Sequence, residues 1–348
     1  MAIMVTGGAG YIGSHAVKKL LELGHRVVAV DNLARGHQQA IDRLMTIAEG
    51  RLEFVKADTG DRPAIEAALR DHSVDTVMHF AALTYVGESV TEPLSYYRAN
   101  TAGVLSLIEA CDAVGVTRFI FSSTCATYGE PPKVPMDEST PQFPVSPYGA
   151  SKLHVEHILR DYAEACRRSG RDFAYTALRY FNVAGSDPDG LIGEDHRPET
   201  HLIPVVIQAA MGLRDTITIF GTDYDTPDGT CIRDYVHVCD LVDAHITVMD
   251  ALKPGDERFY NLGIGNGISV REIIDSVKRV SGKDFAITEG ERRAGDPSAL
   301  FADPNKIRSE LGWAARYTEI DRIVETAWKW FSENPEGYAE AQAEGNTG

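Results

Sequence analysis

The feature that most constrains the fold is a glycine-rich turn set between a short apolar run and a helical pattern. Residues 2–5 (AIMV) are apolar, residues 6–13 read TGGAGYIG, and helical spacing runs over Ile12–Leu23. Glycines in such a turn let backbone N–H groups approach a bound phosphate at the positive end of the helix. The segment therefore predicts the first strand, turn and helix of a dinucleotide-binding sheet.

The glycines of this turn satisfy two overlapping fingerprints. Gly8, Gly10 and Gly13 give G-x-G-x-x-G, and Gly7, Gly10 and Gly13 give G-x-x-G-x-x-G. A glycine turn that only packs a helix on a strand is the alternative interpretation. The apolar run before the turn and the helical pattern after it supply the context that favours dinucleotide binding.

An acidic residue follows at the end of the second predicted strand. Asp31 stands 18 residues beyond Gly13. A carboxylate at this place accepts hydrogen bonds from an adenosine ribose and repels a 2′-phosphate, which favours NAD over NADP. Arg35 lies close by and is the residue that would favour NADP instead.

The first half of the chain alternates apolar runs with helical patterns, which is typical of a parallel sheet covered by helices on both faces. The predicted strands are residues 2–5, 27–30, 53–55, 76–80, 118–122 and 173–179. The predicted helices are Ile12–Leu23, Ile41–Ala48, Pro63–Arg70, Pro93–Ala113 and Pro147–Arg168, the last with Ser146 as its N-cap. The predicted fold class is α/β, a Rossmann-type doubly wound parallel sheet with a smaller C-terminal α/β substrate-binding lobe.

Beyond residue 180 the pattern changes to long irregular segments. Residues 182–201 and 221–230 are rich in Gly, Pro and Asp and are typical of substrate loops. A short strand is expected over Ile217–Phe220, a capping box at Ser269–Glu272 opens a helix, and a last helix covers 319–331. We expect an NAD-binding domain over 1–180, to which segments around 232–262 return, a substrate lobe over 181–340 and a frayed tail over 341–348.

Charge and cysteine content exclude several classes of protein. The 51 acidic and 34 basic residues give a net charge of −17, without a basic run, so nucleic acid is not an expected partner. No apolar run is long enough for a membrane span, and no basic segment precedes the first apolar residues, so a cytoplasmic protein without membrane contact is expected. The five cysteines are odd in number and lack C-x-x-C spacing, so neither disulfides nor a metal site is predicted.

Tyr148 and Lys152 are four residues apart near the start of a predicted helix, which places both on one face. A free tyrosine is a poor base at neutral pH because its pKa is about 10. An ammonium and a cationic nicotinamide ring nearby would both favour the phenolate. Isolated Tyr-x-x-x-Lys pairs are common by chance, but this one follows a dinucleotide fingerprint. It is therefore a candidate acid/base pair.

A run of hydroxyl residues ends the fifth predicted strand. Residues 121–129 read FSSTCATYG. The carboxyl end of a parallel strand is where such sheets bind ligands, so one of these hydroxyls is placed to hydrogen-bond a reacting oxygen. Ser122 and Ser123 are equally well explained as groups that only cap the strand end.

These motifs together resemble the extended short-chain dehydrogenase/reductase family. The resemblance rests on TGGAGYIGS, SSTCATYG and SPYGASK, and it narrows to the sugar-nucleotide 4-epimerases of that family through HFAALTYVGESV, LRYFNVAG, GEDHRPETHLIP, IFGTDYDTPDGTCIRDYVHV, YNLG and RRAGDP. The resemblance covers about residues 3–335, and the motifs occur along the chain in the same order as in the family. It implies that NAD is a tightly held cofactor and that UDP-glucose and UDP-galactose are interconverted at C4 through a transient 4-keto sugar.

The resemblance also assigns site residues. It makes Tyr148 the acid/base, Lys152 its helper and Thr124 the hydroxyl at the same substrate oxygen. The implied cofactor-binding residues are Gly7, Gly10, Tyr11, Ile12, Gly13, Asp31, Asn32, Asp58, Thr59, Phe80, Ala81, Ala82, Leu83, Asn100, Tyr148, Lys152 and Phe181. The implied substrate-binding residues are Thr124, Tyr148, Asn182, His201, Leu202, Ile219, Phe220, Arg233, Arg293, Asp296 and Leu300.

Two of these residues give an acidic chain a way to bind an anionic ligand. Arg233 and Arg293 are guanidinium forks suited to a diphosphate, and both stand in Gly/Asp-rich loops. By the resemblance, Leu300 matches a position that borders the sugar, and its intermediate size leaves N-acetylated UDP-sugars open as substrates. A UDP-pentose is a separate alternative substrate. A non-catalytic NAD sensor is a further alternative. Members of the family are commonly homodimers, which is the expectation here.

Overall fold

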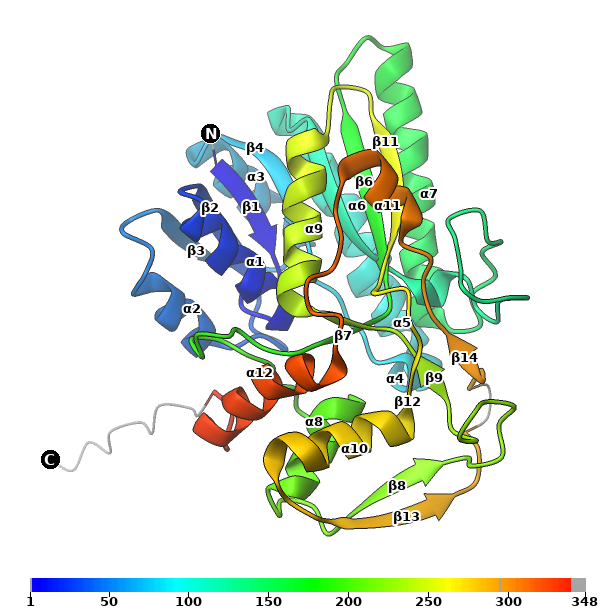
Figure 1. Cartoon of the computed structure of the whole chain (residues 1–348). Coiled ribbons are helices and arrows are strands. Elements are labelled where there is room, and N and C mark those ends of the chain that lie inside the picture. The colour runs from blue at the N-terminus through cyan, green and yellow to red at the C-terminus, as the bar shows by residue number, and fades with distance from the viewer. Residues whose placement is uncertain (1, 294–295, 339–348) are drawn as a thin grey trace, which may run out of the picture.

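A seven-stranded parallel sheet forms the centre of the computed structural model, which describes residues 2–293 and 296–338 (Figure 1). Every neighbouring pair of its strands is parallel, in the order β11-β6-β5-β4-β1-β2-β3. Its strands are β1 (Ala2–Thr6), β2 (Arg26–Asp31), β3 (Leu52–Lys56), β4 (Val74–His79), β5 (Arg118–Thr124), β6 (Ala174–Tyr180) and β11 (Glu257–Leu262). Because the chain order reverses between β1 and β4, a crevice for ligands is expected there, at the carboxyl ends of the strands.

Both faces of this sheet are buried, as an all-parallel sheet requires. Ile3 and Val5 of β1 join one apolar cluster, whereas Ala2 and Met4, which point the other way, join the opposite cluster. The first cluster is covered by α1 (Tyr11–Glu22), α2 (Gln38–Met45), α9 (Val238–Ala251) and α11 (Asn305–Leu311). The second is covered by α3 (Arg62–Asp71), α6 (Gly103–Val114) and α7 (Pro147–Arg168).

The predicted helix over Pro93–Ala113 is present, but it contains a π-helical turn. After α4 (Val86–Thr91), the chain forms α5 (Pro93–Tyr96), a π-helical turn (Tyr97–Ala102) and then α6. The π turn widens the helix locally and brings Asn100, which is 1% exposed, against the backbone of Leu83. A regular helix would rotate Asn100 to a different direction.

The segments after β6 build a smaller lobe below the carboxyl ends of the sheet (Figure 1). Its helices share a third apolar cluster in which Trp330 is fully buried. The remaining elements are β7 (Asn182–Ala184), α8 (Leu202–Ala210), β8 (Thr216–Phe220), β9 (Ile232–Arg233), β10 (Tyr235–His237), β12 (Ile268–Ser269), α10 (Val270–Ser281), β13 (Ala286–Gly290), β14 (Ala299–Leu300) and α12 (Ile320–Glu333).

Residues 182–201, predicted to be a loop throughout, begin instead with β7, which pairs with β10. The chain then returns to the first sheet through α9 and β11, with β11 beside β6. The expected frayed tail over 341–348 lies outside the described residues. Among the helices that the structure describes, none is long and apolar enough to cross a membrane.

Two predicted caps are confirmed. The Ser146 side chain accepts a hydrogen bond from the N–H of Gly149 at 3.2 Å, at the start of α7. Ser269 and Glu272 form both hydrogen bonds of a capping box at the start of α10. Each cap satisfies N–H groups that have no partner within the helix, so the start of the helix is well defined.

Candidate active site

The glycine turn packs too closely for side chains at Gly7, Gly8 and Gly13, and a Cβ on Gly8 would lie 2.8 Å from the Cβ of Ala29. Gly7 has φ +72°, and a Cβ there would lie 2.6 Å from the backbone nitrogen of Ala81. A Cβ on Gly13 would lie 2.0 Å from the carbonyl oxygen of Gly7. Gly10 is the N-cap of α1 and offers no side-chain cap, so the first N–H groups of the helix remain available to an anion. This cradle fits a dinucleotide pyrophosphate, with Tyr11 and Ile12 opening the helix beside it.

Asp31 is held at the end of β2 by two backbone hydrogen bonds. Its carboxylate accepts from the N–H of Ala9 at 3.0 Å and of Leu33 at 2.8 Å. Burial raises its pKa, and these two hydrogen bonds oppose that effect. Arg35, the residue that would favour NADP, instead pairs with Glu88 at 2.7 Å and stacks on the ring of Tyr85. The site therefore fits an unphosphorylated ribose better than a 2′-phosphate.

Three further cofactor candidates lie around the end of β3. The Asn32 amide donates to the Asp58 carboxylate at 2.7 Å, and Asp58 also accepts from the N–H of Gly60 at 2.8 Å. Thr59 packs closely against Gly103, where a Cβ would lie 3.2 Å from the Thr59 hydroxyl. Asn32, Asp58 and Thr59 thus come together beside Asp31, at the side of the crevice expected for the adenosine.

The loop after β4 carries Phe80, Ala81, Ala82 and Leu83, and Asn100 holds its far end. The Asn100 side chain accepts from the N–H of Leu83 and donates to its carbonyl, both at 2.8 Å. The same amide group donates to the hydroxyl of Ser151 on α7 at 3.2 Å. One buried side chain therefore ties this loop to the helix that carries the acid/base candidates.

Thr124, Tyr148 and Lys152 lie together at the carboxyl end of β5. Thr124 is the last residue of β5, and Tyr148 and Lys152 stand in the first turns of α7. All three are buried, with Tyr148 8% and Lys152 3% exposed. The Lys152 ammonium donates to the carbonyl oxygen of Ser122 at 2.9 Å. Ser122 thus holds Lys152 through its backbone carbonyl, whereas the sequence points only to its hydroxyl.

Burial changes the protonation of this pair. It lowers the pKa of Lys152 to about 7, because a cation is costly in an apolar environment. It raises the pKa of Tyr148 well above its usual value, while a hydrogen bond with Thr124 acts in the opposite direction. In the protein without ligands Tyr148 is therefore a neutral phenol. A cationic group bound beside it would be needed to draw the pKa down toward neutral pH.

The substrate candidates of the smaller lobe gather around β9 and β14. Arg233 on β9 pairs with Asp296 and donates to the carbonyl of Pro297 at 2.9 Å. Leu300 is the register partner of Arg233 in β14. Leu300 also packs in a small apolar cluster with Phe181 and Cys125, the neighbour of Thr124. The smaller lobe therefore reaches the end of the catalytic strand.

Arg293 and Asn182 lie at two other places on the same lobe. The Arg293 guanidinium stacks over the ring of Phe220 at 4.2 Å, next to Ile219 at the end of β8. Among the described residues Arg293 forms no ion pair, so its charge remains available to an anion. The Asn182 amide donates to the carbonyl of Asp234 at 3.2 Å.

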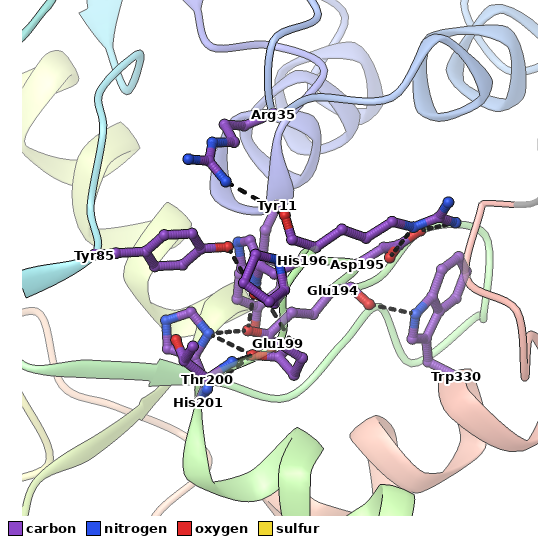
Figure 2. A network of polar contacts seen from close by, with 12 residues as sticks. Tyr11, Arg35, Tyr85, Glu194, Asp195, His196, Glu199, Thr200, His201 and Trp330 are labelled. Atoms are coloured by element: carbon purple, nitrogen blue, oxygen red, sulfur yellow. Dashed lines mark hydrogen bonds and ion pairs between the residues drawn. The ribbon is translucent and has the colours of Figure 1, made fainter. Parts of the chain in front are cut away.

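The last two substrate candidates, His201 and Leu202, stand at the start of α8. Figure 2 shows His201 in a network with His196, Glu194 and Glu199, near Tyr11 and Tyr85. Burial opposes protonation of His201, but hydrogen bonds to the two glutamates outweigh it and raise its pKa to about 10. The same balance raises the pKa of His196 to about 9.

Sequence reasoning missed two polar networks. Glu156, one turn beyond Lys152, forms a buried ion pair with Arg179 of β6 at 2.6 Å and accepts from Ser123 at 2.6 Å. Glu156 is four residues beyond Lys152 and therefore on the same face of α7, which is the sequence signal that could have revealed it. The second network is the glutamate and histidine cluster over residues 194–201, of which only His201 was predicted as a site residue. Its E-x-H-x-x-E-x-H pattern was the available signal.

Comparison with known proteins identifies the family. A model of the NAD dependent epimerase/dehydratase family matches residues 3–263. The chain belongs to this family. This membership confirms the predicted family and the predicted NAD cofactor, and the parallel sheet confirms the predicted fold class.

Individual members of the NAD dependent epimerase/dehydratase family match over nearly the whole chain. The UDP-glucose 4-epimerase of Lacticaseibacillus casei is 46% identical over 98% of this chain and 99% of its own length. A probable UDP-arabinose 4-epimerase of Oryza sativa subsp. japonica is 45% identical over 98% of this chain and 82% of its own. The crystal structure of UDP-glucose 4-epimerase from Bifidobacterium longum, in complex with NAD+ and UDP, superposes with a TM-score of 0.91 at 37% identity, covering 97% of this chain and 100% of that one.

Proposed function

We propose that this chain interconverts UDP-glucose and UDP-galactose by NAD-dependent epimerisation at C4 of the sugar. The observation that carries the proposal is the buried group of Thr124, Tyr148 and Lys152 at the end of β5, reached by a lobe that bears Arg233 and Arg293. A redox site next to cationic forks fits a sugar attached to a diphosphate. The relatives named UDP-glucose 4-epimerase support the same substrate.

The chain's own residues divide the work in this proposal. Tyr148 removes the proton of the sugar 4-OH, with Thr124 hydrogen-bonded to the same oxygen, and later returns the proton. Lys152, held by the Ser122 carbonyl, places positive charge beside the phenol. NAD, when bound, supplies a reversible hydride acceptor, so that the sugar passes through a 4-keto form. Gly7, Gly10, Gly13 and Asp31 would hold it.

The anchoring residues act far from the reacting carbon. Arg233 and Arg293 bind the diphosphate, while few groups hold the sugar itself. Binding energy placed on a remote part of the substrate leaves the sugar free to turn over between the two hydride transfers. This arrangement explains why an isomerase needs strong nucleotide contacts and weak sugar contacts.

The residues after Thr124 argue against a dehydratase. Cys125 and Ala126 follow it, so no carboxylate stands beside the hydroxyl to expel water. Burial raises the pKa of the Cys125 thiol to about 12, which keeps it neutral and unable to replace a carboxylate as base. Epimerisation at C4 is the chemistry that these side chains support.

The test is incubation of the purified chain with UDP-galactose and no added cofactor, followed by separation of the UDP-sugars. We expect UDP-glucose to form, because the cofactor is recovered in each turnover and stays bound. The proposal would be contradicted if the protein, after NAD has been added, left both UDP-sugars unchanged. That result would favour a non-catalytic NAD sensor if NAD were nevertheless bound.

A UDP-pentose is the second candidate substrate. Probable UDP-arabinose 4-epimerases of plants are 45% identical to this chain, and a related structure from Stenotrophomonas maltophila holds NAD and formylated UDP-arabinopyranose. The same assay with UDP-xylose and with an N-acetylated UDP-sugar ranks the substrates. If product formed only from UDP-xylose, a UDP-pentose would replace UDP-glucose and UDP-galactose as the first candidate substrate.

We also propose that the chain forms a homodimer through the helices after β4. Val90, Leu94 and Leu105 of α4, α5 and α6 are 62%, 76% and 44% exposed. Exposed aliphatic side chains grouped on neighbouring helices favour burial against a second copy. The division into an NAD-binding domain over 1–180, with the returning segments, and a substrate lobe over 181–340 is kept as part of this proposal.

A further inference from the structure

Two glutamates and two histidines of the loop before α8 face one another closely. Ligand atoms of Glu194, His196, Glu199 and His201 all lie within 4.8 Å of one another. Figure 2 shows the four side chains converging from one short stretch of chain. This cluster, which we call the E-H-E-H cluster, lies outside the NAD cradle and the acid/base group described above, and it shares His201 with the substrate candidates.

Four nitrogen–oxygen separations inside the E-H-E-H cluster, two of which are hydrogen bonds, lie close to the edge length of a metal coordination shell. The Nδ1 atom of His196 lies 3.0 Å from a Glu194 oxygen and 3.7 Å from a Glu199 oxygen. The Nδ1 atom of His201 lies 3.1 Å and 2.9 Å from oxygens of the same two residues. Four ligands about 2.0–2.1 Å from a tetrahedral Zn²⁺ stand about 3.4 Å apart, in the middle of this range.

The charges of the cluster are compatible with a bound cation. The side chains of Glu194 and Glu199 are only 3% and 4% exposed, and among the described residues their ion-pair partners are the two imidazoles alone. Two buried carboxylates side by side repel each other unless positive charge lies between them. The two imidazoles supply that charge when both are protonated, and one divalent cation replaces it when both are in the neutral form that binds metals.

The surrounding loop is already held in place by contacts outside the cluster. The indole N–H of Trp330 donates to the Glu194 carbonyl at 2.9 Å, and the Tyr85 hydroxyl donates to the Pro198 carbonyl at 3.0 Å. His201 is 41% exposed, which leaves a path for an ion from solvent. Partners that fix the ligand-bearing backbone raise the affinity of a metal site.

We propose that the E-H-E-H cluster binds one divalent transition-metal ion of the zinc class, through two imidazole nitrogens and two carboxylates. Nitrogen and oxygen ligands in equal number suit Zn²⁺ rather than Mg²⁺ or Ca²⁺, which prefer oxygen alone. The ion joins residues 194 and 196 to residues 199 and 201, and so fixes the loop that precedes α8. Tyr11 of α1 lies edge-on to His196 at 6.0 Å, so the ion also stiffens the boundary between the lobe and the NAD cradle.

The first test uses the full chain without an affinity tag, freed of metal with a chelator and then exposed to Zn²⁺ or Co²⁺. We expect one ion per chain by elemental analysis, and with Co²⁺ the strong visible bands of a four-coordinate ion. Weak six-coordinate bands, or no uptake, would overturn the proposal. A thiolate-to-cobalt charge-transfer band would place the ion at a cysteine and overturn it as well.

The second test uses His196→Gln and Glu199→Gln, with His157→Gln as the matched control because His157 is exposed on α7. We expect each cluster variant to lose at least tenfold in Zn²⁺ affinity, while the control binds as the parent chain does. Far-UV circular dichroism checks that each variant is folded. Unchanged affinity in both folded cluster variants would overturn the proposal, and if a variant does not fold, the cobalt spectrum of the parent chain decides.

Calorimetry of Zn²⁺ binding to the parent chain gives a readout that needs no variant. Buffers of different ionisation enthalpy report how many protons leave when the ion binds. We expect proton release, because the ion displaces the protons that His196 and His201 otherwise hold between the carboxylates. Binding without any proton release would place the ion elsewhere and overturn the proposal.

Discussion

Tyr148 and Lys152 show how one environment changes two side chains in opposite ways. Both are buried at the start of α7, where the phenol becomes a weaker acid and the ammonium a stronger one. At neutral pH Tyr148 is therefore a neutral phenol rather than a tyrosinate, and Lys152 is only partly protonated. The residue-level chemistry is therefore incomplete until a positively charged ring lies beside the phenol.

Replacing Tyr148 by Phe removes the proposed acid/base and leaves the ring in place. We expect turnover of UDP-galactose to fall by ~10²–10⁴-fold, the usual contribution of a positioned acid or base, while NAD stays bound. Tyr162→Phe, on the far part of the same helix, is the control and should leave the rate unchanged. An unaltered rate in Tyr148→Phe would rule out this role for Tyr148.

Lys152 also makes stability depend on pH. Its pKa is about 7 in the folded protein and about 10.5 in the unfolded chain, so between these values the unfolded chain binds more protons. Stability contributed by Lys152 therefore rises with pH from about 7 to about 10.5. In NAD-free protein, we expect the free energy of unfolding of Lys152→Met to exceed that of the parent most at and below pH 7. This difference should shrink as pH rises. Urea unfolding at several pH values measures it, and a pH-independent difference would contradict it.

At the scale of elements, the π turn before α6 fixes the position of the loop after β4, which carries Phe80 to Leu83. It places Asn100 so that its amide makes both hydrogen bonds to the Leu83 backbone. The buried pair of Glu156 and Arg179 acts similarly, because it holds α7 on β6 one turn from Lys152. Breaking such a pair leaves an uncompensated buried charge.

Replacing Asn100 by Ala leaves the N–H and carbonyl of Leu83 without these partners. We expect a loss of about 1–3 kcal/mol in the free energy of unfolding, the cost of buried polar groups left unsatisfied, and weaker retention of NAD. Asn266→Ala, the same substitution at an exposed position of the loop after β11, is the control. Urea unfolding and the amount of NAD that co-purifies are the measurements. A variant with parental stability and NAD content would show that the loop does not depend on Asn100.

At the scale of the whole molecule, a bound UDP-sugar would lie between the sheet and the smaller lobe. The two parts meet where Cys125, Phe181 and Leu300 pack together. The acid/base residues come from the sheet and the arginines from the lobe, so neither part holds the complete site.

Replacing Arg293 by Ala removes a proposed anchor for the remote diphosphate of the substrate. We expect KM for UDP-galactose to rise by roughly tenfold, which is about 1.4 kcal/mol, with kcat nearly unchanged. Arg292→Ala is a close control, since Arg292 pairs with Asp223 and stacks on Tyr224. A fall in kcat with KM unchanged would show instead that Arg293 acts on the reacting carbon.

The dimer proposal makes a separate prediction for Leu94→Arg combined with Leu105→Arg. Two charges on this apolar surface should prevent burial against a second copy and give a monomer by size-exclusion chromatography with light scattering. Leu213→Arg, another exposed leucine at 58%, is the control. A parent chain that is already monomeric, or a double variant that remains dimeric, would contradict the proposed interface.

Local rules in the sequence were enough to predict much of the fold. Ser146 and the Ser269/Glu272 box cap helices as expected, and the glycine turn follows β1 as its spacing requires. These features depend on neighbours within a few residues, so short patterns reveal them. The π turn around Asn100 and the strand β7 depend on partners far along the chain, so periodicity could not predict them.

What the sequence by itself determined is the glycine turn, the strand and helix alternation and the Tyr148/Lys152 spacing, because each follows from backbone sterics or from the period of one element. Only the tertiary structure decided that Arg35 turns to Glu88, that Ser122 serves Lys152 through its carbonyl, and that Glu194, His196, Glu199 and His201 converge. The physical reason is that side-chain direction and burial depend on packing between segments distant in sequence, which no local pattern records.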